Sequence, residues 1–178
     1  GVRCGANAVY LGAKNFNARR NADNFDDYEL KKAVEYCHQR GVKVYQTLNI
    51  LVSDSEMKLA YETVDRSLSV GIDAFIVQDL GLAKMIKEHF PTARLHASTQ
   101  CSVNTPQGFK ALEKLGFKRA VLPREMSIDE IKEIRSSTDM ELEMFVHGAL
   151  CMCVSGQCYL SAMLGSRSGN RGLCAQPC

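Results

Sequence analysis

The sequence predicts an α/β fold of the TIM-barrel type, (β/α)8, of which these 178 residues supply about six βα units. Short apolar segments alternate along the chain with segments of helical periodicity, the pattern of parallel strands joined by right-handed helical crossovers. Polar side chains also follow nearly every apolar segment, and the carboxyl ends of barrel strands converge on one mouth. Residues 1–178 are therefore expected to form a single barrel domain.

Six apolar segments predict strands covered on both faces, because each is short and lacks regular polar alternation. In chain order they are residues 8–12, 42–50, 73–79, 94–100, 117–125 and 142–148. Two intervening segments show helical spacing most clearly. The first places Leu30, Ala33, Val34 and Cys37 on one face, and the second does the same with Met57, Ala60, Tyr61, Val64 and Leu68.

Local signals place the ends of these helices. Two serines stand three residues before a glutamate, the spacing of a capping box, and one threonine precedes a proline suited to the first helical position. These starts are Ser53-x-x-Glu56, Ser127-x-x-Glu130 and Thr105-Pro106. Gly41, Gly71 and Gly116 stand where helices should end and the chain must turn into a strand.

A doubly wound sheet is the other parallel architecture, and it would carry G-x-G-x-x-G after its first strand. The segment AVYLG is followed instead by AKNFNARRNADNF, which has no such glycines. The polar residues after the strands favour the barrel, and several of them are candidates for binding a substrate at its mouth. These candidates are Asn15, Asn17, Gln46, Asn49, Gln78, Ser98 and Gln100.

Six strands do not close an eight-stranded barrel. The opening GVRCGANAVYLG also contains Gly-Ala-Asn, which is typical of a turn between a helix and a strand. We therefore expect the domain to be truncated at both ends, with one βα unit before residue 1 and closing elements after Cys178.

Composition restricts the class of protein and its compartment. The chain has 22 basic and 20 acidic residues, a net charge of +2, which gives no electrostatic case for a nucleic-acid coat protein or a membrane-surface binder. No run of about 18 apolar residues predicts a membrane span, and the first residues lack the order of a signal peptide. We expect a cytoplasmic protein whose eight cysteines are reduced thiols or metal ligands.

Four cysteines lie close together near the end of the chain, in a stretch rich in glycine and serine. Cys151, Cys158, Cys174 and Cys178 follow the last expected strand. Their spacings do not match a pair of zinc knuckles, whereas iron–sulfur clusters accept more varied spacings. Ligation of a metal or cluster is favoured, with redox disulfide chemistry as the alternative, and Cys153 has no assigned role. Isolated Cys4, Cys37 and Cys101 are expected to be small buried hydrophobic residues.

The catalytic residues stay open, with His147, Glu143 and Arg124 as candidates. No H-E-x-x-H or G-x-S-x-G motif is present, and His147 need not contact the nearby Cys151. Glu143 is either an interior carboxylate paired with Arg124 or a plain charge at the start of a strand. The remaining histidines, His38, His89 and His96, are expected to be structural.

Arginines in the loops are candidates for contacts with a nucleic acid. Arg167 and Arg171 flank the glycines of SRSGNRG, where flexible arginines suit phosphate groups. Together with Asn15 and Asn17 they could hold a base splayed out of its strand. The alternative is a solvated loop with scattered charge.

The segment EMFVHGALC, residues 143–151, followed by GQCYLS, residues 156–161, resembles the signature of the collagenase-like peptidase family U32. Similarity to that family extends along the chain. It includes GANAVYLGAKNFNARRNADNF, GVKVYQTLNILVSDSE, IVQDLGLAKMIKEHFP, LHASTQCSVNT and SRSGNRGLCAQPC. The resemblance implies a barrel that begins before and continues beyond this chain.

The resemblance implies two kinds of activity. The family is named for a protease of unassigned catalytic type, and it includes oxygen-independent hydroxylases that modify a base of tRNA or rRNA, or the ring of a ubiquinone precursor. The hydroxylating members hold a [4Fe–4S] cluster, and those acting on RNA are linked to prephenate. Matched to their motif, Cys151, Cys158 and Cys174 are the expected ligands, with Cys178 or a cysteine outside this chain as the fourth.

These implications lead to one preferred function and two alternatives. The preferred function is iron–sulfur-dependent hydroxylation of an RNA base or a similar aromatic ring. The first alternative is a peptidase. The second is a cluster-bearing accessory subunit that works beside a paired homologous subunit.

Overall fold

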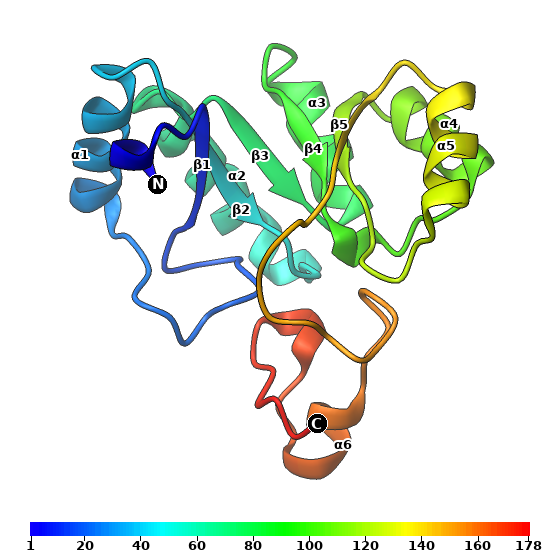
Figure 1. The fold of residues 1–178 in the computed structure, drawn as a ribbon. Coiled ribbons are helices and arrows are strands. Elements are labelled where there is room, and N and C mark those ends of the chain that lie inside the picture. Colours follow the sequence, from blue (N-terminus) through cyan, green and yellow to red (C-terminus); the bar gives the residue numbers. More distant parts are fainter.

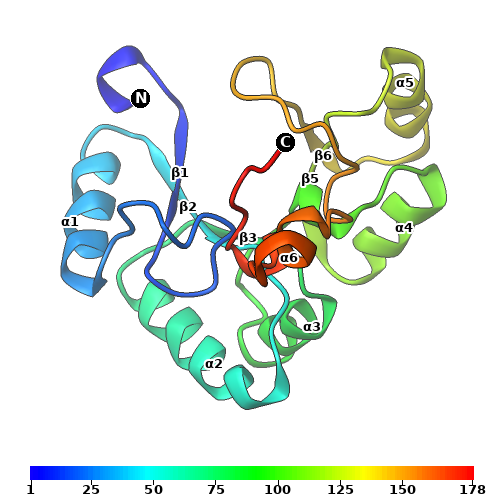
Figure 2. The ribbon, with the colours of Figure 1, turned by 90° about the horizontal axis from the view of Figure 1, so that it is seen from below.

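The computed structural model describes residues 1–178 and contains one parallel sheet whose six strands follow the chain in the order β1-β2-β3-β4-β5-β6. The strands are β1 (Ala8–Gly12), β2 (Lys43–Leu48), β3 (Ala74–Val77), β4 (Leu95–Ala97), β5 (Phe117–Val121) and β6 (Glu141–Glu143). This sequential order is that of a barrel, and the sheet curls into a half-barrel (Figures 1 and 2). The expected architecture is confirmed.

Helices join the strands and cover the convex face of the sheet (Figure 2). They are α1 (Asp27–His38), α2 (Asp54–Ser69), α3 (Leu80–His89), α4 (Pro106–Lys114) and α5 (Ile128–Ser137), and α6 (Leu160–Gly165) follows the sheet. Three short 3-10 helices are η1 (Val2–Cys4), η2 (Thr99–Cys101) and η3 (Gly169–Arg171). None of the helices is long and apolar enough to cross a membrane.

The helix ends follow the local signals in the sequence. Ser53 with Glu56 and Ser127 with Glu130 form capping boxes at the starts of α2 and α5. Thr105 caps α4, where its hydroxyl accepts a hydrogen bond from a backbone amide at 3.2 Å. A further capping box, which the sequence analysis did not identify, starts α1 at Asp26 and Glu29.

The two faces of the sheet bury different side chains, because successive residues of a strand point to opposite faces. The convex face packs against the helices and supplies most of the core. Its strand residues include Val44, Leu48, Phe75, Val77 and Leu95, all of which are fully buried. The concave face holds a smaller cluster of Tyr45, Ala74 and Ile76. The concave face is therefore the one with room for polar side chains.

The last strand is much shorter than the segment 142–148 that the sequence predicts. β6 ends at Glu143 and pairs only with β5. Beyond it the chain leaves the sheet, and Val146 is 90% exposed. An apolar run at the edge of a sheet has only one neighbouring strand, so apolar composition alone does not extend the ladder.

The three isolated cysteines differ in how deeply they are buried. Cys37 is buried on the inner face of α1, as expected. Cys101 is half-buried, its thiol contacts the carbonyl oxygens of Val77 and Gln78, and burial raises its pKa to about 12. Cys4 is exposed, contrary to expectation, because η1 buries none of its residues.

Candidate functional site

The C-terminal segment, residues 151–178, docks on the loops that follow the strands. It lies across the mouth of the half-barrel at the carboxyl ends of the strands (Figures 1 and 2). Two groups of contacts hold it there, one beside β4 and β5 and the other beside β1 and β2. The cysteine-bearing segment thus stands where barrel enzymes build their active sites.

Ser155 makes the first docking contact. Its backbone amide and hydroxyl donate to the carboxylate of Glu125 at 2.8 and 3.0 Å, and Glu125 follows β5. The hydroxyl of Ser102, which follows η2, donates to the carbonyl oxygen of Ser155 at 2.6 Å. Gly156 is in the left-handed region at φ 80°, and a side chain there would overlap the carbonyl oxygen of Gln100. The chain therefore approaches the barrel too closely at this point for any residue but glycine.

Arg171 makes the second docking contact. Its guanidinium donates two hydrogen bonds to Glu56, at 2.9 and 2.6 Å, and a further one to the carbonyl oxygen of Leu51. The hydrogen bond from Arg171, helped by those from Ser53, lowers the pKa of Glu56 to about 2. Two backbone hydrogen bonds continue this contact: Leu51 donates to Asn170 at 3.1 Å and Arg20 donates to Gly172 at 3.2 Å.

All the thiols of the C-terminal segment are free, and Cys153 lies beside Cys158. A hydrogen bond with Cys158 raises the pKa of the Cys153 thiol, and the negative charges of Cys158, Cys151 and Cys178 raise it further. Among the predicted ligands, Cys158 therefore has the largest effect on Cys153. Cys174, the fourth predicted ligand, accepts a hydrogen bond from the backbone amide of Gln176 at 3.4 Å.

The donor set fits an iron–sulfur cluster in its chemistry. Thiolates close together repel one another, as the raised pKa of Cys153 beside Cys158 indicates, and a bound cation removes that repulsion. No three or more Cys, His, Asp or Glu side chains are arranged in the structure as a metal site. Binding would therefore require the segment to close around the cluster.

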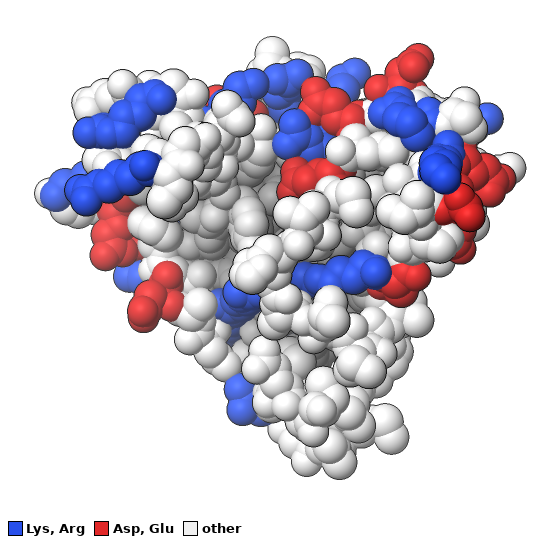
Figure 3. All heavy atoms as spheres, in the orientation of Figure 1, with Lys and Arg blue, Asp and Glu red and all other residues white.

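The surface of this segment differs from the rest of the molecule. Residues 144–166 contain no Lys, Arg, Asp or Glu. In Figure 3 the lower part of the molecule, where α6 lies, is accordingly almost free of charged side chains. Val146, Leu150, Met152 and Met163 are each more than 80% exposed, at 90%, 82%, 82% and 83%. The thiols thus lie on a segment with an uncharged, largely apolar surface, on which Cys151, Cys174 and Cys178 are exposed.

Several candidates for binding a substrate are engaged within the loops. The amide of Asn17 donates to the carbonyl oxygen of Ala13 at 2.6 Å, and that of Asn49 accepts from the backbone of Ala18 at 2.9 Å. Ser98 caps η2. Arg171 is committed to Glu56. These side chains shape the mouth, whereas the exposed Asn15 and Arg167 and the half-buried Gln100 leave their polar groups available.

Gln46 and Gln78, two of the predicted substrate-binding residues, are both buried. Gln46 lies within β2 on the same face as Val44 and Leu48, is 0% exposed, and has no hydrogen-bond partner for either side-chain polar atom. Its inclusion among the residues of the mouth is therefore wrong, because one step along a strand reverses the face. Gln78 directly follows β3 and is buried, with its side-chain oxygen unpaired.

Of the two interpretations of Glu143, the one in which it pairs with Arg124 is wrong. Glu143 pairs with Arg119 at 3.1 Å, because parallel pairing sets Glu143 opposite Val121 and Arg119 lies two residues earlier on the same face. The guanidinium of Arg124 instead lies 4.1 Å from the ring centre of Phe145. His147 is exposed, so no nucleophile–base pair with Cys151 is formed.

Sequence reasoning missed a polar row on the concave face. His96, Arg119 and Glu141 are aligned across β4, β5 and β6, and Arg119 donates to Glu141 at 2.9 and 2.6 Å. The rings of His96 and Tyr45 meet edge to face with centres 4.7 Å apart. The alternation of side chains along a strand could have predicted this row. Leu95 and Ala97 point into the core on the convex face, so His96 between them points to the concave face.

Curated proteins named for RNA modification and for proteolysis are similar to this chain over nearly its whole length. The chain is 42% identical over 98% of its length to the 23S rRNA 5-hydroxycytidine synthase of Escherichia coli, and covers 26% of that protein. It is 43% identical over 98% of its length to an uncharacterized protease of Methanocaldococcus jannaschii, covering 43% of it. It is 37% identical over 98% of its length to the tRNA hydroxylation protein P of Escherichia coli, covering 39% of it. The chain thus spans less than half the length of these relatives.

The fold is shared with a solved structure of a U32 peptidase. The two superpose with a TM-score of 0.67 at 18% identity, over 78% of this chain and 60% of that one. The model of peptidase family U32 matches residues 2–178. With a half-barrel fold and a match across nearly its whole length, the chain belongs to peptidase family U32.

Proposed function

We propose that this chain is the cluster-holding domain of an enzyme that hydroxylates a base of ribosomal or transfer RNA. The observation that carries the proposal is the similarity, over 98% of the chain, to two proteins named for RNA hydroxylation. The docked cysteine segment supports it, because it brings thiols to the end of the barrel where substrates bind.

Cys151, Cys158, Cys174 and Cys178 are the residues that would hold a [4Fe–4S] cluster, and Cys153, whose pKa is raised chiefly by Cys158, is the alternative to one of them. When bound, such a cluster supplies one-electron redox chemistry. The chain's own residues have two other tasks. The contacts of Ser155 and Arg171 hold the thiols over the mouth, and the exposed apolar side chains of the same segment offer an uncharged surface beside them.

RNA binding at the mouth is part of the proposal. Asn15, Arg19, Arg20 and Arg167 are exposed in loops at this end of the half-barrel. Arginines bind phosphate groups, and an amide can recognise the edge of a base. Prephenate stays a proposed co-substrate, to which we assign no residue.

Peptidase activity is the second candidate, favoured by the name of the Methanocaldococcus jannaschii relative. A cysteine peptidase needs a base in hydrogen-bonding contact with its nucleophile. His147 is exposed and makes no hydrogen bond to a cysteine, so the geometry favours the hydroxylase. Cleavage of gelatin by the pure protein, abolished by His147→Ala, would reverse this order.

The test of the proposed function is the nucleoside composition of cellular RNA. The gene for the full-length protein is deleted and replaced with the parent, Cys158→Ala or Cys4→Ala, and digested tRNA and rRNA are measured by mass spectrometry. We expect one hydroxylated nucleoside to disappear on deletion and to return with the parent and Cys4→Ala, since Cys4 is exposed far from the segment. An unchanged nucleoside profile on deletion would refute the proposal.

A further inference from the structure

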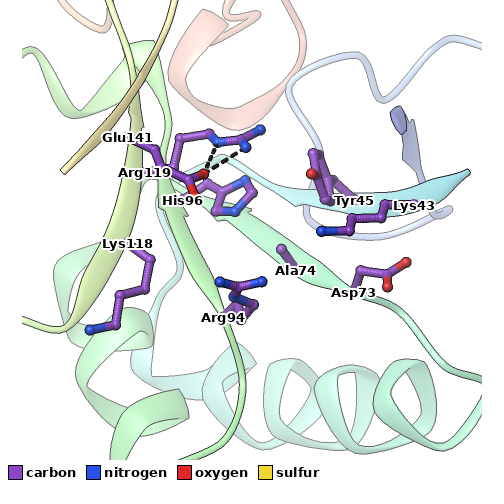
Figure 4. A pocket seen from close by; sticks show the side chains of 9 residues that line it. All are labelled: Lys43, Tyr45, Asp73, Ala74, Arg94, His96, Lys118, Arg119 and Glu141. Atoms are coloured by element: carbon purple, nitrogen blue, oxygen red, sulfur yellow. Dashed lines mark hydrogen bonds and ion pairs between the residues drawn. The ribbon is translucent and has the colours of Figure 1, made fainter. Parts of the chain in front are cut away.

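A second pocket lies at the opposite end of the half-barrel from the cysteines, at the amino ends of the strands. It has a volume of about 100 Å³. Lys43, Arg94, Lys118 and Arg119 contribute four positive charges to its lining, and Asp73 and Glu141 contribute two negative ones. In Figure 4 the side chains of Lys43, Arg94 and Arg119 extend toward His96, whereas that of Lys118 extends away from it. The proposed hydroxylation makes no use of this pocket.

His96 forms the floor of the pocket. It is 4% exposed, and its Nδ1 atom is buried with no hydrogen-bond partner. Burial and the nearby charge of Arg119 lower the pKa of His96 to about 4, so the ring is neutral near pH 7 and carries one N–H. A buried polar atom left without a partner is unfavourable, so such atoms usually meet a ligand or a water.

Both carboxylates of the pocket are already engaged by the protein. Glu141 accepts two hydrogen bonds from Arg119. Asp73 accepts one from the backbone amide of Val44 at 2.7 Å and contacts His38 at 2.9 Å. Lys43, Arg94 and Lys118, by contrast, form no ion pair. The rim therefore keeps three positive charges that no carboxylate of the chain balances.

We propose that this pocket binds a small oxyanion, a phosphate or carboxylate group, with His96 Nδ1–H donating from the floor and Arg94 and Lys43 holding it at the rim. A cavity of about 100 Å³ has room for one such group. Because the pocket lies away from the cysteines, the proposal stands independently of RNA hydroxylation.

Binding is measured on the full-length protein by titration calorimetry with inorganic phosphate and with malonate, at constant ionic strength set with chloride. The His96 ring is followed in parallel by NMR. We expect saturable binding of at least one anion and a shift of the His96 resonances, since the ligand contacts the ring. Tighter binding of phosphate would assign a phosphorylated ligand, and tighter binding of malonate a carboxylate. Absence of saturable binding by both anions would overturn the proposal.

Two variants locate the bound anion. Lys43→Gln removes a rim cation, and Lys110→Gln removes an exposed lysine of α4 that does not line the pocket. We expect Lys43→Gln to weaken binding about tenfold, the loss of one charge-assisted hydrogen bond, and Lys110→Gln to leave it unchanged. Equal affinity in both variants would show that the anion binds elsewhere and contradict the proposal.

Discussion

Arg171 joins the C-terminal segment to the loop before α2, where Glu56 already serves the capping box with Ser53. The capping role of Glu56 could be predicted, because a capping box is a local pattern of four residues. Its pairing with Arg171 could not, since 115 positions separate the two residues and only the fold brings them together. The same holds for Glu125, whose partner Ser155 lies 30 residues further on.

Arg171→Ala should lower the free energy of unfolding at pH 7. The side chains of Arg171 and Glu56 are 35% and 30% exposed, so water screens the pair and we expect a loss of about 1 kcal/mol. The measurement is urea unfolding of the parent and the variant. Arg66→Ala is the matched control, because its pair with Asp27 is more exposed, at 47% and 78%, and should contribute less.

The effect of Arg171→Ala should also depend on pH. The folded pKa of Glu56, about 2, is below its ordinary value of 4.5, so its stabilisation is fully present above pH 4.5 and is lost as pH falls toward 2. The difference between parent and variant should shrink across this interval. A difference that stays constant from pH 6 down to about pH 2 would show that Glu56 is not the partner that matters.

At the scale of elements, the sequence predicts the strands and helices well but not their faces or the path after β5. Five apolar segments contain strands close to the expected ranges, because buried parallel strands are continuous apolar runs. The apolar run after Glu143 is instead exposed beyond the edge of the sheet. The position of Gln46 near the end of its strand predicts a place at the mouth. The alternation of faces along the strand instead directs its side chain into the core.

Gly156→Ala should release the cysteine segment while leaving the half-barrel folded. A side chain at this position would overlap the carbonyl oxygen of Gln100 in a backbone conformation that alanine rarely adopts. We expect faster cleavage of residues 144–160 in limited proteolysis, together with an unchanged circular dichroism spectrum. Gly165→Ala is the control, because nothing lies within 4 Å of an added side chain there. Equal cleavage rates for both variants would contradict the docked arrangement.

At the scale of the whole molecule, two regions at opposite ends of one half-barrel have different chemistry. The carboxyl ends of the strands carry the thiols and an apolar surface, and the amino ends carry a basic pocket. The thiol end could be predicted, since four cysteines cluster in the sequence itself. The basic pocket could not, because Lys43 begins β2, Arg94 directly precedes β4 and Lys118 lies in β5, and only the parallel sheet brings them together.

The most direct test of the account is the iron and sulfide content of the full-length protein after anaerobic reconstitution, measured for the parent and for single Cys→Ala variants. We expect about four iron and four sulfide ions per chain in the parent, a large loss in Cys151→Ala, Cys158→Ala and Cys174→Ala, and no change in Cys4→Ala. Cys153→Ala and Cys178→Ala together identify the fourth ligand. If Cys151→Ala and Cys158→Ala bind as much iron as the parent, these cysteines are not ligands, and the cluster-dependent hydroxylase is contradicted.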